Sequence, residues 1–310
     1  MQAIQYDRFG GPEVLRLTEV SVPEPGPGQV RIDLRAASVI PGDCKLRAGH
    51  LTALFPVTFP KIPGRDGAGL VGKLGPNVAD IAVGAAVCVV AQHIQPGTYA
   101  DSIVVDRDAV VPLPANLTFE EGAALMHAGV CAWICLVEAT HLHPGMRVLI
   151  HGGAGAIGGL SIQLAHHLGA YVATTCSSKN AGYVSKLGAD KVIAYDRDDF
   201  SHALRDFDVV LDLIGGHVHD GSYSVLQRGG TIVALRAAPI VDRSQEFGVR
   251  LTIPDIHDRS YALEAVVGLG KSGAVQPQIC DTLKLQDAAA AHRRIEAGSV
   301  SRGRLVLQMA

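Results

Sequence analysis

The amino-acid sequence predicts an α/β protein that combines a doubly wound parallel sheet with a second domain of short strands. Strand and helix patterns alternate between residues 147 and 254, with a G-x-G-x-x-G loop after the first strand of the series. Residues 1–115 instead show short strand patterns separated by Gly and Pro. The 310 residues also exceed the usual length of one domain, so we expect two.

Residues 1–117 are predicted to form the domain of short strands. A connector rich in Pro and Gly, residues 23–28, separates the first two strands. Many short strands with such breaks are typical of a partly open β-barrel. The expected strands are 15–20, 30–36, 69–74, 85–90 and 102–105.

Residues 118–254 are predicted to form the doubly wound domain. Thr118 and Glu121 fit a capping box, so a helix of about 20 residues should follow them. Continuous apolar strands that alternate with helices indicate a parallel sheet covered on both faces, and six strands match a complete dinucleotide-binding (Rossmann) fold. The expected strands are 147–151, 171–176, 191–195, 208–212, 231–235 and 249–253, and the helices between them are 157–167, 181–187, 201–205 and 219–226.

Residues 255–310 return to a mixed pattern and are expected to pack onto the first domain. Helices are predicted at 260–271 and 285–296, and a strand at 304–308. The strand at 249–253 would end the parallel sheet, and an uncovered edge of this kind could pair with its copy in a dimer.

The strongest local signal is the loop Gly153-Ala154-Gly155-Ala156-Ile157-Gly158, which fits G-x-G-x-x-G between a predicted strand and helix. In this motif the first glycine permits a tight turn, the second lets the backbone approach a pyrophosphate, and the third allows close packing of helix on strand. The N–H groups at the helix start then face the anion. The alternative is a glycine-rich turn in an α/β protein that binds no nucleotide.

The segment after the second strand selects between NAD and NADP. An NAD-binding protein usually has Asp or Glu there, which accepts a hydrogen bond from the ribose 2′-hydroxyl. Here residues 175–180 read TCSSKN and offer the hydroxyls of Ser177 and Ser178 and the charge of Lys179. These groups suit a 2′-phosphate, so we predict NADP(H). The alternative is that the serines only cap a turn and the lysine is solvated.

Six motifs along the chain point to one family: AASVIPGDCK at 36–45, PGRDGAG at 63–69, GTYAD at 97–101, HGGAGAIG at 151–158, LGAD at 187–190 and DLIGG at 212–216. With them the chain resembles the zinc-independent quinone oxidoreductase-like branch of the medium-chain dehydrogenase/reductase superfamily. The resemblance implies a GroES-like catalytic domain and a nicotinamide in the cleft between the two domains. It also implies NADPH-dependent reduction of quinones or of the C=C bond of enones and alkenals, usually by a homodimer.

The resemblance also assigns cofactor contacts to positions of this chain. The pyrophosphate loop falls on residues 153–158, and the 2′-phosphate site on Ser177 and Ser178. The lysine that often assists there aligns with Asn180, so Lys179 is one position away. Further contacts are implied for Tyr195, beside the adenosine phosphate, for Leu213 and Leu235, whose backbone approaches the cofactor, for Cys131, where Thr is common, and for Arg302, in a tail segment that often closes over the cofactor.

A catalytic zinc ion is not expected. By the resemblance, the Cys and His that hold zinc in other branches are replaced by Ile40 and Arg65, which supply no ligand atom. Cys44 lies four residues from the ligand position and should not substitute for it. The six cysteines form no CxxC pair and are interpreted as reduced thiols, with Cys131 and Cys135 in the core.

Lys45 is the leading candidate for a catalytic group. It matches a lysine of enone- and enoyl-reducing relatives near the nicotinamide, where a donor would stabilise negative charge on the substrate carbonyl. The alternative is an exposed lysine on a loop or short helix. Asp66, like Asp43, is expected to orient the site, although Asp43 could equally cap a helix starting near Cys44. Arg65 is expected to contact the cofactor or substrate, or to pair with an acid.

Ile40 departs from the family, because most quinone-reducing relatives have Asn there. With Cys131 it makes the expected pocket less polar, so we predict an apolar quinone or carbonyl acceptor. Ile40 also keeps open a second function, an NADPH-binding protein of the same fold with little catalysis. A third, a zinc alcohol dehydrogenase, is nearly excluded by the missing ligands.

Composition excludes other classes of function. The net charge of −3 carries no long run of either sign, so a nucleic-acid or membrane-surface partner is not expected. The N-terminus has no signal pattern, no segment reads as a membrane span, and a cytoplasmic protein is expected.

Overall fold

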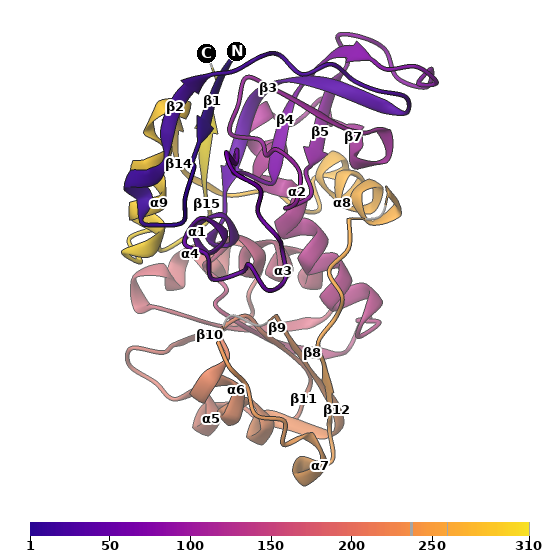
Figure 1. Ribbon diagram of the computed structural model, residues 1–310. Helices are drawn as coiled ribbons and strands as arrows, with labels where there is room; N and C mark the ends of the chain where they lie inside the picture. Colours follow the sequence, from indigo (N-terminus) through magenta and orange to yellow (C-terminus); the bar gives the residue numbers. More distant parts are fainter. Residues whose placement is uncertain (236–237, 259, 310) are drawn as a thin grey trace. The chain divides into compact units, whose positions relative to one another are not determined.

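The computed structural model describes residues 1–235, 238–258 and 260–309, which form two compact units (Figure 1). Unit 1 comprises Met1–His127, Asp258–Ser272 and Pro277–Ala310, and unit 2 comprises Ala128–His257 and Gly273–Gln276. The sequence placed the boundaries after residues 117 and 254, whereas the compact units divide after residues 127 and 257.

Unit 1 is built on a seven-stranded sheet with the order β14-β15-β3-β4-β5-β7, in which β6 also pairs with β3. The long strand β3 organises it: β4 pairs antiparallel along one edge, while β6 and β15 pair with successive parts of the other. The side chains of β3 alternate between buried and half-buried over residues 29–34 and form part of one apolar core. The strands are β3 (Gln29–Val39), β4 (Asp66–Leu74), β5 (Ala86–Val90), β6 (Ser102–Asp106), β7 (Val110–Pro112), β14 (Ile279–Lys284) and β15 (Arg304–Gln308).

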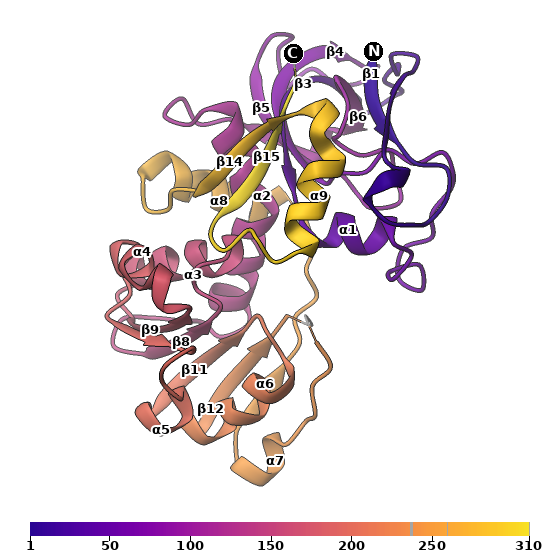
Figure 2. The same cartoon turned by 90° about the vertical axis from the view of Figure 1, so that its left-hand side faces the viewer.

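Three strands of unit 1 were not predicted, namely β7, β14 and the N-terminal strand β1. β1 (Gln2–Gln5) pairs with β2 (Arg16–Glu19) in a separate antiparallel sheet, β7 covers three residues, and β14 pairs parallel with β15. The helices of this unit are α1 (Pro41–Arg47), α8 (Ser260–Ser272) and α9 (Ala288–Glu296). Figure 2 shows α9 alongside β14 and β15, and it also contacts α1 through the ion pair of the buried Arg47 with Glu296.

Helix α2 (Phe119–Trp133) begins as predicted and continues as a π-helical turn, Ile134–Glu138. The Thr118 N–H donates to Glu121 Oε2 (2.8 Å), and the Glu121 N–H donates to Thr118 Oγ1 (3.2 Å), which confirms the capping box. The expectation that no segment could span a membrane is wrong by length and composition, because Phe119–Glu138 passes that test. However, 72% of its apolar window is buried inside the fold, as in the core helix of many soluble proteins.

Unit 2 is the predicted doubly wound sheet. Its six strands are all parallel and follow the order β10-β9-β8-β11-β12-β13, with helices α3 and α4 on one face and α5 and α6 on the other (Figure 1). The strands are β8 (Arg147–His151), β9 (Tyr171–Cys176), β10 (Lys191–Ala194), β11 (Phe207–Asp212), β12 (Leu226–Ala234) and β13 (Arg250–Thr252), and the helices are α3 (Ala156–His167), α4 (Ala181–Lys186), α5 (Phe200–Ala203), α6 (Gly216–Ser222) and α7 (Ser244–Phe247).

Unit 2 departs from the prediction at α7, which was not predicted, and at α6 and β12, whose bounds were misplaced. The helix expected at 219–226 ends at Ser222 with a short 3-10 turn, Tyr223–Val225, and β12 starts at Leu226 rather than Thr231. Gly229 and Gly230 lay outside the predicted strand, but β12 passes through both glycines with φ of +81° at Gly229 and an irregular register against β11. Glycine permits that conformation, so a glycine pair need not end a strand.

Close packing at Gly158 gives a testable consequence. A Cβ added there would lie 2.3 Å from the Gly152 carbonyl oxygen and 2.7 Å from Gly153 Cα. We expect Gly158→Ala to lower the free energy of unfolding by about 1–3 kcal/mol, because backbone must shift to accept the methyl group. The measurement is urea denaturation followed by circular dichroism.

Gly182 in α4 is the matched control, since a Cβ there meets no atom within 4 Å. Gly182→Ala should leave stability unchanged or raise it by up to about 1 kcal/mol, because alanine favours helix. Equal denaturation midpoints for the two variants would contradict the packing argument.

Candidate cofactor site and active-site residues

A cavity of about 740 Å³ opens in unit 2 at the carboxyl ends of the parallel strands. It lies where the strand order reverses between β8 and β11, which is the position at which doubly wound sheets bind nucleotides. Its walls come from the ends of β8 and β9, the segment after β10, and α6 with the loop before it. The lining residues are His151, Gly152, Thr175, Tyr195, Asp196, Arg197, Asp198, Asp199, Phe200, Ser201, Ile214, His217, Val218 and Gly221.

The glycine loop precedes α3, and Gly155 is the N-cap residue of that helix, with no side-chain cap. The first N–H groups of a helix have no partner within it, so this terminus suits a diphosphate. A Cβ at Gly155 would come no nearer to this chain than 3.4 Å, at the Gly152 carbonyl oxygen, so the fold itself leaves space there. The residues present therefore fit the diphosphate of a dinucleotide.

The roles of the other two glycines are partly corrected. The tight turn has its positive φ (+71°) at Gly152, not at Gly153. Gly153 is needed for a different reason, because a Cβ there would lie 2.0 Å from the Thr174 hydroxyl oxygen. Gly158 packs as predicted, directly against the backbone of Gly152.

His151 connects this loop to α6. Its Nδ1 lies 3.0 Å from Thr175 Oγ1 and its Nε2 lies 3.0 Å from Ser222 Oγ. The Ser222 hydroxyl donates to the Val218 carbonyl (2.7 Å), so the Nε2–H must donate to Ser222 and Nδ1 must accept from Thr175. Burial lowers the pKa of His151 to about 4, which agrees with this neutral imidazole. Thr175 in turn accepts from the Gly152 N–H (3.3 Å).

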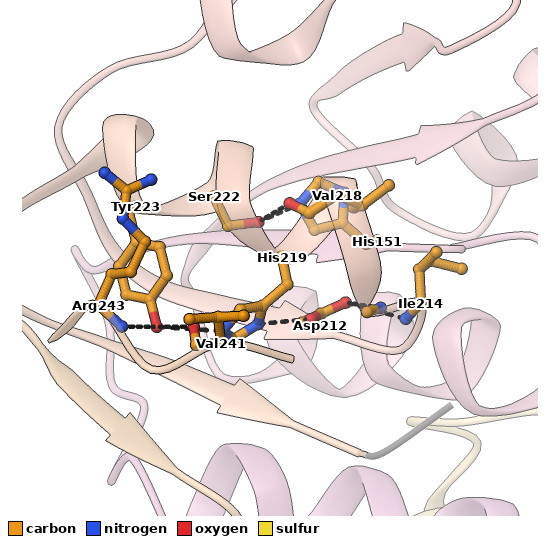
Figure 3. A network of polar contacts seen from close by, with 10 residues as sticks. His151, Asp212, Ile214, Val218, His219, Ser222, Tyr223, Val241 and Arg243 are labelled. Carbon is orange, nitrogen blue, oxygen red and sulfur yellow. Dashed lines mark hydrogen bonds and ion pairs between the residues drawn. The ribbon is translucent and has the colours of Figure 1, made fainter. Parts of the chain in front are cut away.

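A second buried network fixes the loop after β11 (Figure 3). Asp212 Oδ1 accepts from the N–H groups of Ile214 and Gly215, both at 2.9 Å, and its Oδ2 pairs with His219 Nδ1 at 2.8 Å. The other imidazole nitrogen lies 3.0 Å from the Tyr223 hydroxyl, which accepts from the Arg243 N–H (3.0 Å). The carboxylate of the DLIGG motif therefore holds the loop that contributes Ile214 to the cavity.

The segment expected to select the cofactor differs from the sequence prediction in one respect. Ser177 is half-buried and accepts from the buried Asn180 side chain (3.3 Å), Lys179 is exposed, and Tyr195 is exposed at the cavity wall. Ser178, however, donates to Asp196 through its N–H (2.8 Å) and its hydroxyl (2.7 Å). The end of β9 has no acid of its own, yet the segment after β10 supplies Asp196.

The remaining predicted cofactor contacts occupy separate places. Leu213 and Leu235 are half-buried after β11 and β12, and the Leu235 N–H donates to the Asp212 carbonyl (3.0 Å). Cys131 is buried on α2 and Cys135 is buried on the π-helical turn that follows it, which confirms both as core residues. Arg302 is exposed in unit 1 just before β15. All six cysteines are free.

The candidate catalytic residues Ile40 and Lys45 lie at α1 in unit 1. Ile40 is buried as the N-cap residue, and Lys45 is exposed on the helix. Asp43 occupies the third helical position, where Oδ2 accepts from the Ile40 N–H (3.1 Å) and from the Tyr99 hydroxyl (3.1 Å). Asp43 therefore stabilises the start of α1. The helix begins at Pro41, about one turn before the predicted start near Cys44.

Burial makes Asp43 an unusual carboxyl group. It raises the pKa of Asp43 to about 7, and the nearby Asp66 adds to the rise against the lowering effect of the Ile40 hydrogen bond. Asp66 itself is fully buried and accepts from the Ser38 hydroxyl (2.8 Å), while Thr98 donates to its carbonyl (3.0 Å). Asp66 is thus tied to β3 rather than exposed to a ligand.

Arg65 was expected to contact the cofactor or substrate, or to pair with an acid. It pairs with an acid, because it forms an ion pair with Asp258. His127 Nδ1 lies 3.8 Å from the other oxygen of that carboxylate. Burial raises the pKa of Asp258, but His127 and Arg65 outweigh it and leave the value below its ordinary range. Burial and the charge of Arg65 also lower the pKa of His93 to about 3, so this imidazole is neutral.

Sequence reasoning missed the partners that complete these sites. Asp258 is 193 residues from Arg65, and His219 has no spacing signal that relates it to Asp212. Asp196 directly follows Tyr195, so a search for acids beyond the second strand could have found it. In the ranges that the structure describes, no group of three His, Cys, Asp or Glu side chains is arranged to hold a metal ion.

A dinucleotide-type sheet with a glycine loop, joined in one chain to an antiparallel β domain, defines a two-domain dehydrogenase or reductase. Residues 26–115 match the family model of the alcohol dehydrogenase GroES-like domain, and residues 187–307 match that of zinc-binding dehydrogenases. The chain belongs to the quinone oxidoreductase-like branch of the medium-chain dehydrogenase/reductase superfamily, as its motifs indicated.

Two solved structures support the assignment. The quinone oxidoreductase from Coxiella burnetii is 31% identical, with a TM-score of 0.89, and the alignment covers 100% of this chain and 99% of that one. The Escherichia coli quinone oxidoreductase complexed with NADPH is 25% identical, with a TM-score of 0.90, covering 99% of this chain and 100% of that one.

The curated relatives differ in length. The 2-haloacrylate reductase of Burkholderia sp is 31% identical over 334 residues, which cover 99% of this chain and 98% of that protein. The NADPH-dependent alkenal/one oxidoreductase of Arabidopsis thaliana is 35% identical over 77% of this chain and 63% of that protein. Polyketide synthase GfsB of Streptomyces halstedii is 34% identical over 76% of this chain, which spans only 4% of that protein.

The buried Asp43 predicts a pH dependence of stability. An unfolded carboxyl has its ordinary pKa of 3.8 and the folded one about 7, so the folded chain holds an extra proton between those values. Stability should then fall as pH rises from about 4 to 7. Asn cannot ionise, so the stability of Asp43→Asn relative to the unmodified chain should increase over pH 5–8, measured by thermal unfolding.

Asp281→Asn is the control. Arg294 lowers the pKa of this exposed carboxyl, so Asp281 does not titrate between pH 5 and 8. Its difference from the unmodified chain should stay constant between pH 5 and 8. Parallel profiles for Asp43→Asn and the unmodified chain would show that Asp43 ionises normally.

Proposed function

We propose that this chain is an NADPH-dependent reductase of quinones or of the C=C bond of enones and alkenals, and that it acts without zinc. The observation that supports this most is the glycine loop and α3 terminus beside a cavity at the point where the strand order reverses. NADP(H) is its cofactor, as the NADPH-complexed structural relative and the NADPH-dependent relative indicate. Bound NADPH would supply the hydride.

The residues of unit 2 would hold that cofactor. Residues 153–158 would bind the diphosphate through backbone N–H groups, and Ser177, Ser178 and Lys179 would meet the 2′-phosphate beside Tyr195. The His151 and Asp212 networks would keep the loops around the cavity in place before the cofactor arrives. Leu213, Leu235 and Cys131 of unit 2, with Arg302 of unit 1, complete the proposed set of contacts.

Reduction needs a donor for the acceptor carbonyl, because negative charge builds on that oxygen during hydride transfer. We assign this role to Lys45, which is exposed on a helix whose start is fixed by the buried Asp43. Asp66 and Arg65 would act as positioning residues, since each is bonded within unit 1. We further propose a homodimer formed through β13, the last strand of the parallel sheet.

Zinc independence is supported by the chemistry of the side chains. Ile40 has no ligand atom, and the Arg65 guanidinium already engages the Asp258 carboxylate and would repel a divalent cation. Metal analysis of the purified protein tests this point, and about one zinc ion per chain would contradict it.

The substrate class is tested by steady-state NADPH oxidation with a panel of quinones, enones and alkenals. We expect turnover with higher kcat/KM for apolar acceptors, because Ile40 offers no hydrogen bond. Ile40→Asn should move the preference toward small hydrophilic acceptors by about tenfold. Tight NADPH binding without turnover on any acceptor would favour the second candidate, a cofactor-binding protein with little catalysis.

The role of Lys45 is tested separately. Lys45→Met should lower kcat/KM by about 100-fold, the usual effect of removing one donor to a developing oxyanion, with the Kd for NADPH unchanged. Lys271→Met removes another exposed lysine of unit 1, on α8, and should leave kcat/KM as it was. A similar kcat/KM in both variants would remove Lys45 from the mechanism.

A further inference from the structure

The pair Ser178–Asp196 joins two strand ends of the cofactor site. The Ser178 N–H donates to Asp196 Oδ1 at 2.8 Å, and its hydroxyl donates to Oδ2 at 2.7 Å, so one carboxylate takes both donors of one residue. The hydroxyl and the N–H of Ser178 together lower the pKa of Asp196. Asp196 is therefore an anion at neutral pH, and it lines the cavity.

The hydrogen bonds to Asp196 compete with the binding of a 2′-phosphate at Ser178. Ser178 lies in the segment that would donate to that phosphate, but its donors are engaged by Asp196. A phosphate that approached Ser178 would have to displace the Asp196 carboxylate or bind beside it. In the second case the phosphate and the carboxylate would lie next to each other and repel. A ribose 2′-hydroxyl has the opposite need, because it requires an acceptor such as a carboxylate.

The surrounding charges are of both signs: the exposed Lys179 follows Ser178 in the chain, and Arg197 follows Asp196. Three carboxylates line the cavity after β10, and Arg197 is the single arginine or lysine among the described lining residues. Asp199 is engaged in capping α5, where it accepts from the Ser201 N–H at 2.8 Å. His151 is neutral because burial lowers its pKa to about 4. The repulsion at Ser178 therefore comes chiefly from Asp196, with Asp198 next in the chain.

We propose that Asp196 sets the cofactor specificity of this chain: its carboxylate weakens binding of NADPH and accepts a hydrogen bond from the 2′-hydroxyl of NADH, so that the protein accepts both. The proposal rests on the cofactor site described above. It assigns to a residue just after β10 the role that an acid after the second strand has in NAD-binding proteins.

Calorimetric titration of the full chain with NADPH and with NADH tests the proposal without requiring turnover. For the unmodified chain we expect Kd values for the two cofactors within about tenfold of each other. Asp196→Asn keeps the shape and removes the charge. It should tighten NADPH binding by about five- to tenfold, the effect of one nearby charge in a hydrated site, and weaken NADH binding by a few fold.

Asp198→Asn is the matched control, since it removes a carboxylate from the same cavity wall, two residues away. It should change the ratio of the two Kd values by less than about twofold. Equal ratios in Asp196→Asn and the unmodified chain, or an equal shift in Asp198→Asn, would overturn the proposal while leaving the proposed function intact. A failure of all variants to bind either cofactor would overturn both.

Discussion

The architecture of the cofactor site depends on one close backbone contact, that of Gly158 with the Gly152 carbonyl. A Cβ at Gly158 would lie 2.3 Å from that oxygen, so α3 can start this close to the end of β8 only because the side chain is absent. Gly153 is held in the same way against Thr174. With both contacts made, the free N–H groups at the start of α3 point to the carboxyl ends of the strands, where an anion can reach them.

Two buried polar networks then fix the loops around this contact. His151 connects Thr175, and through it the Gly152 N–H, to Ser222 on α6. Asp212 connects the loop after β11 to the same helix through His219. Because buried polar groups are costly when unpaired, each network strongly favours a single arrangement of its loop. Helix α6 therefore serves as the common support for both sides of the cavity.

Local patterns predicted much of this fold. Strands β8, β9 and β15 have the predicted bounds because each is a short apolar run between clear breaks, and the capping box at Thr118 was read from two residues alone. Prediction failed where pairing overrides local signals. The polar β14 becomes a strand because β15 offers it hydrogen bonds, and β12 starts before its two glycines, where Leu226 pairs with Phe207 of β11.

The site was less predictable than the fold for the same reason. The residue types alone could identify Ser178 and Arg65 as groups that bind anions. They could not show that Ser178 already donates to Asp196 and that Arg65 already pairs with Asp258. Such partners are separated in sequence by 18 and 193 residues and are brought together only by the order of strands and the return of the chain to unit 1. A cationic or hydroxylic side chain in a binding motif therefore indicates a site only together with the acids that the fold places against it. In this chain those acids reduce the positive potential at both positions, which favours ligands of lower charge than the motifs alone suggest.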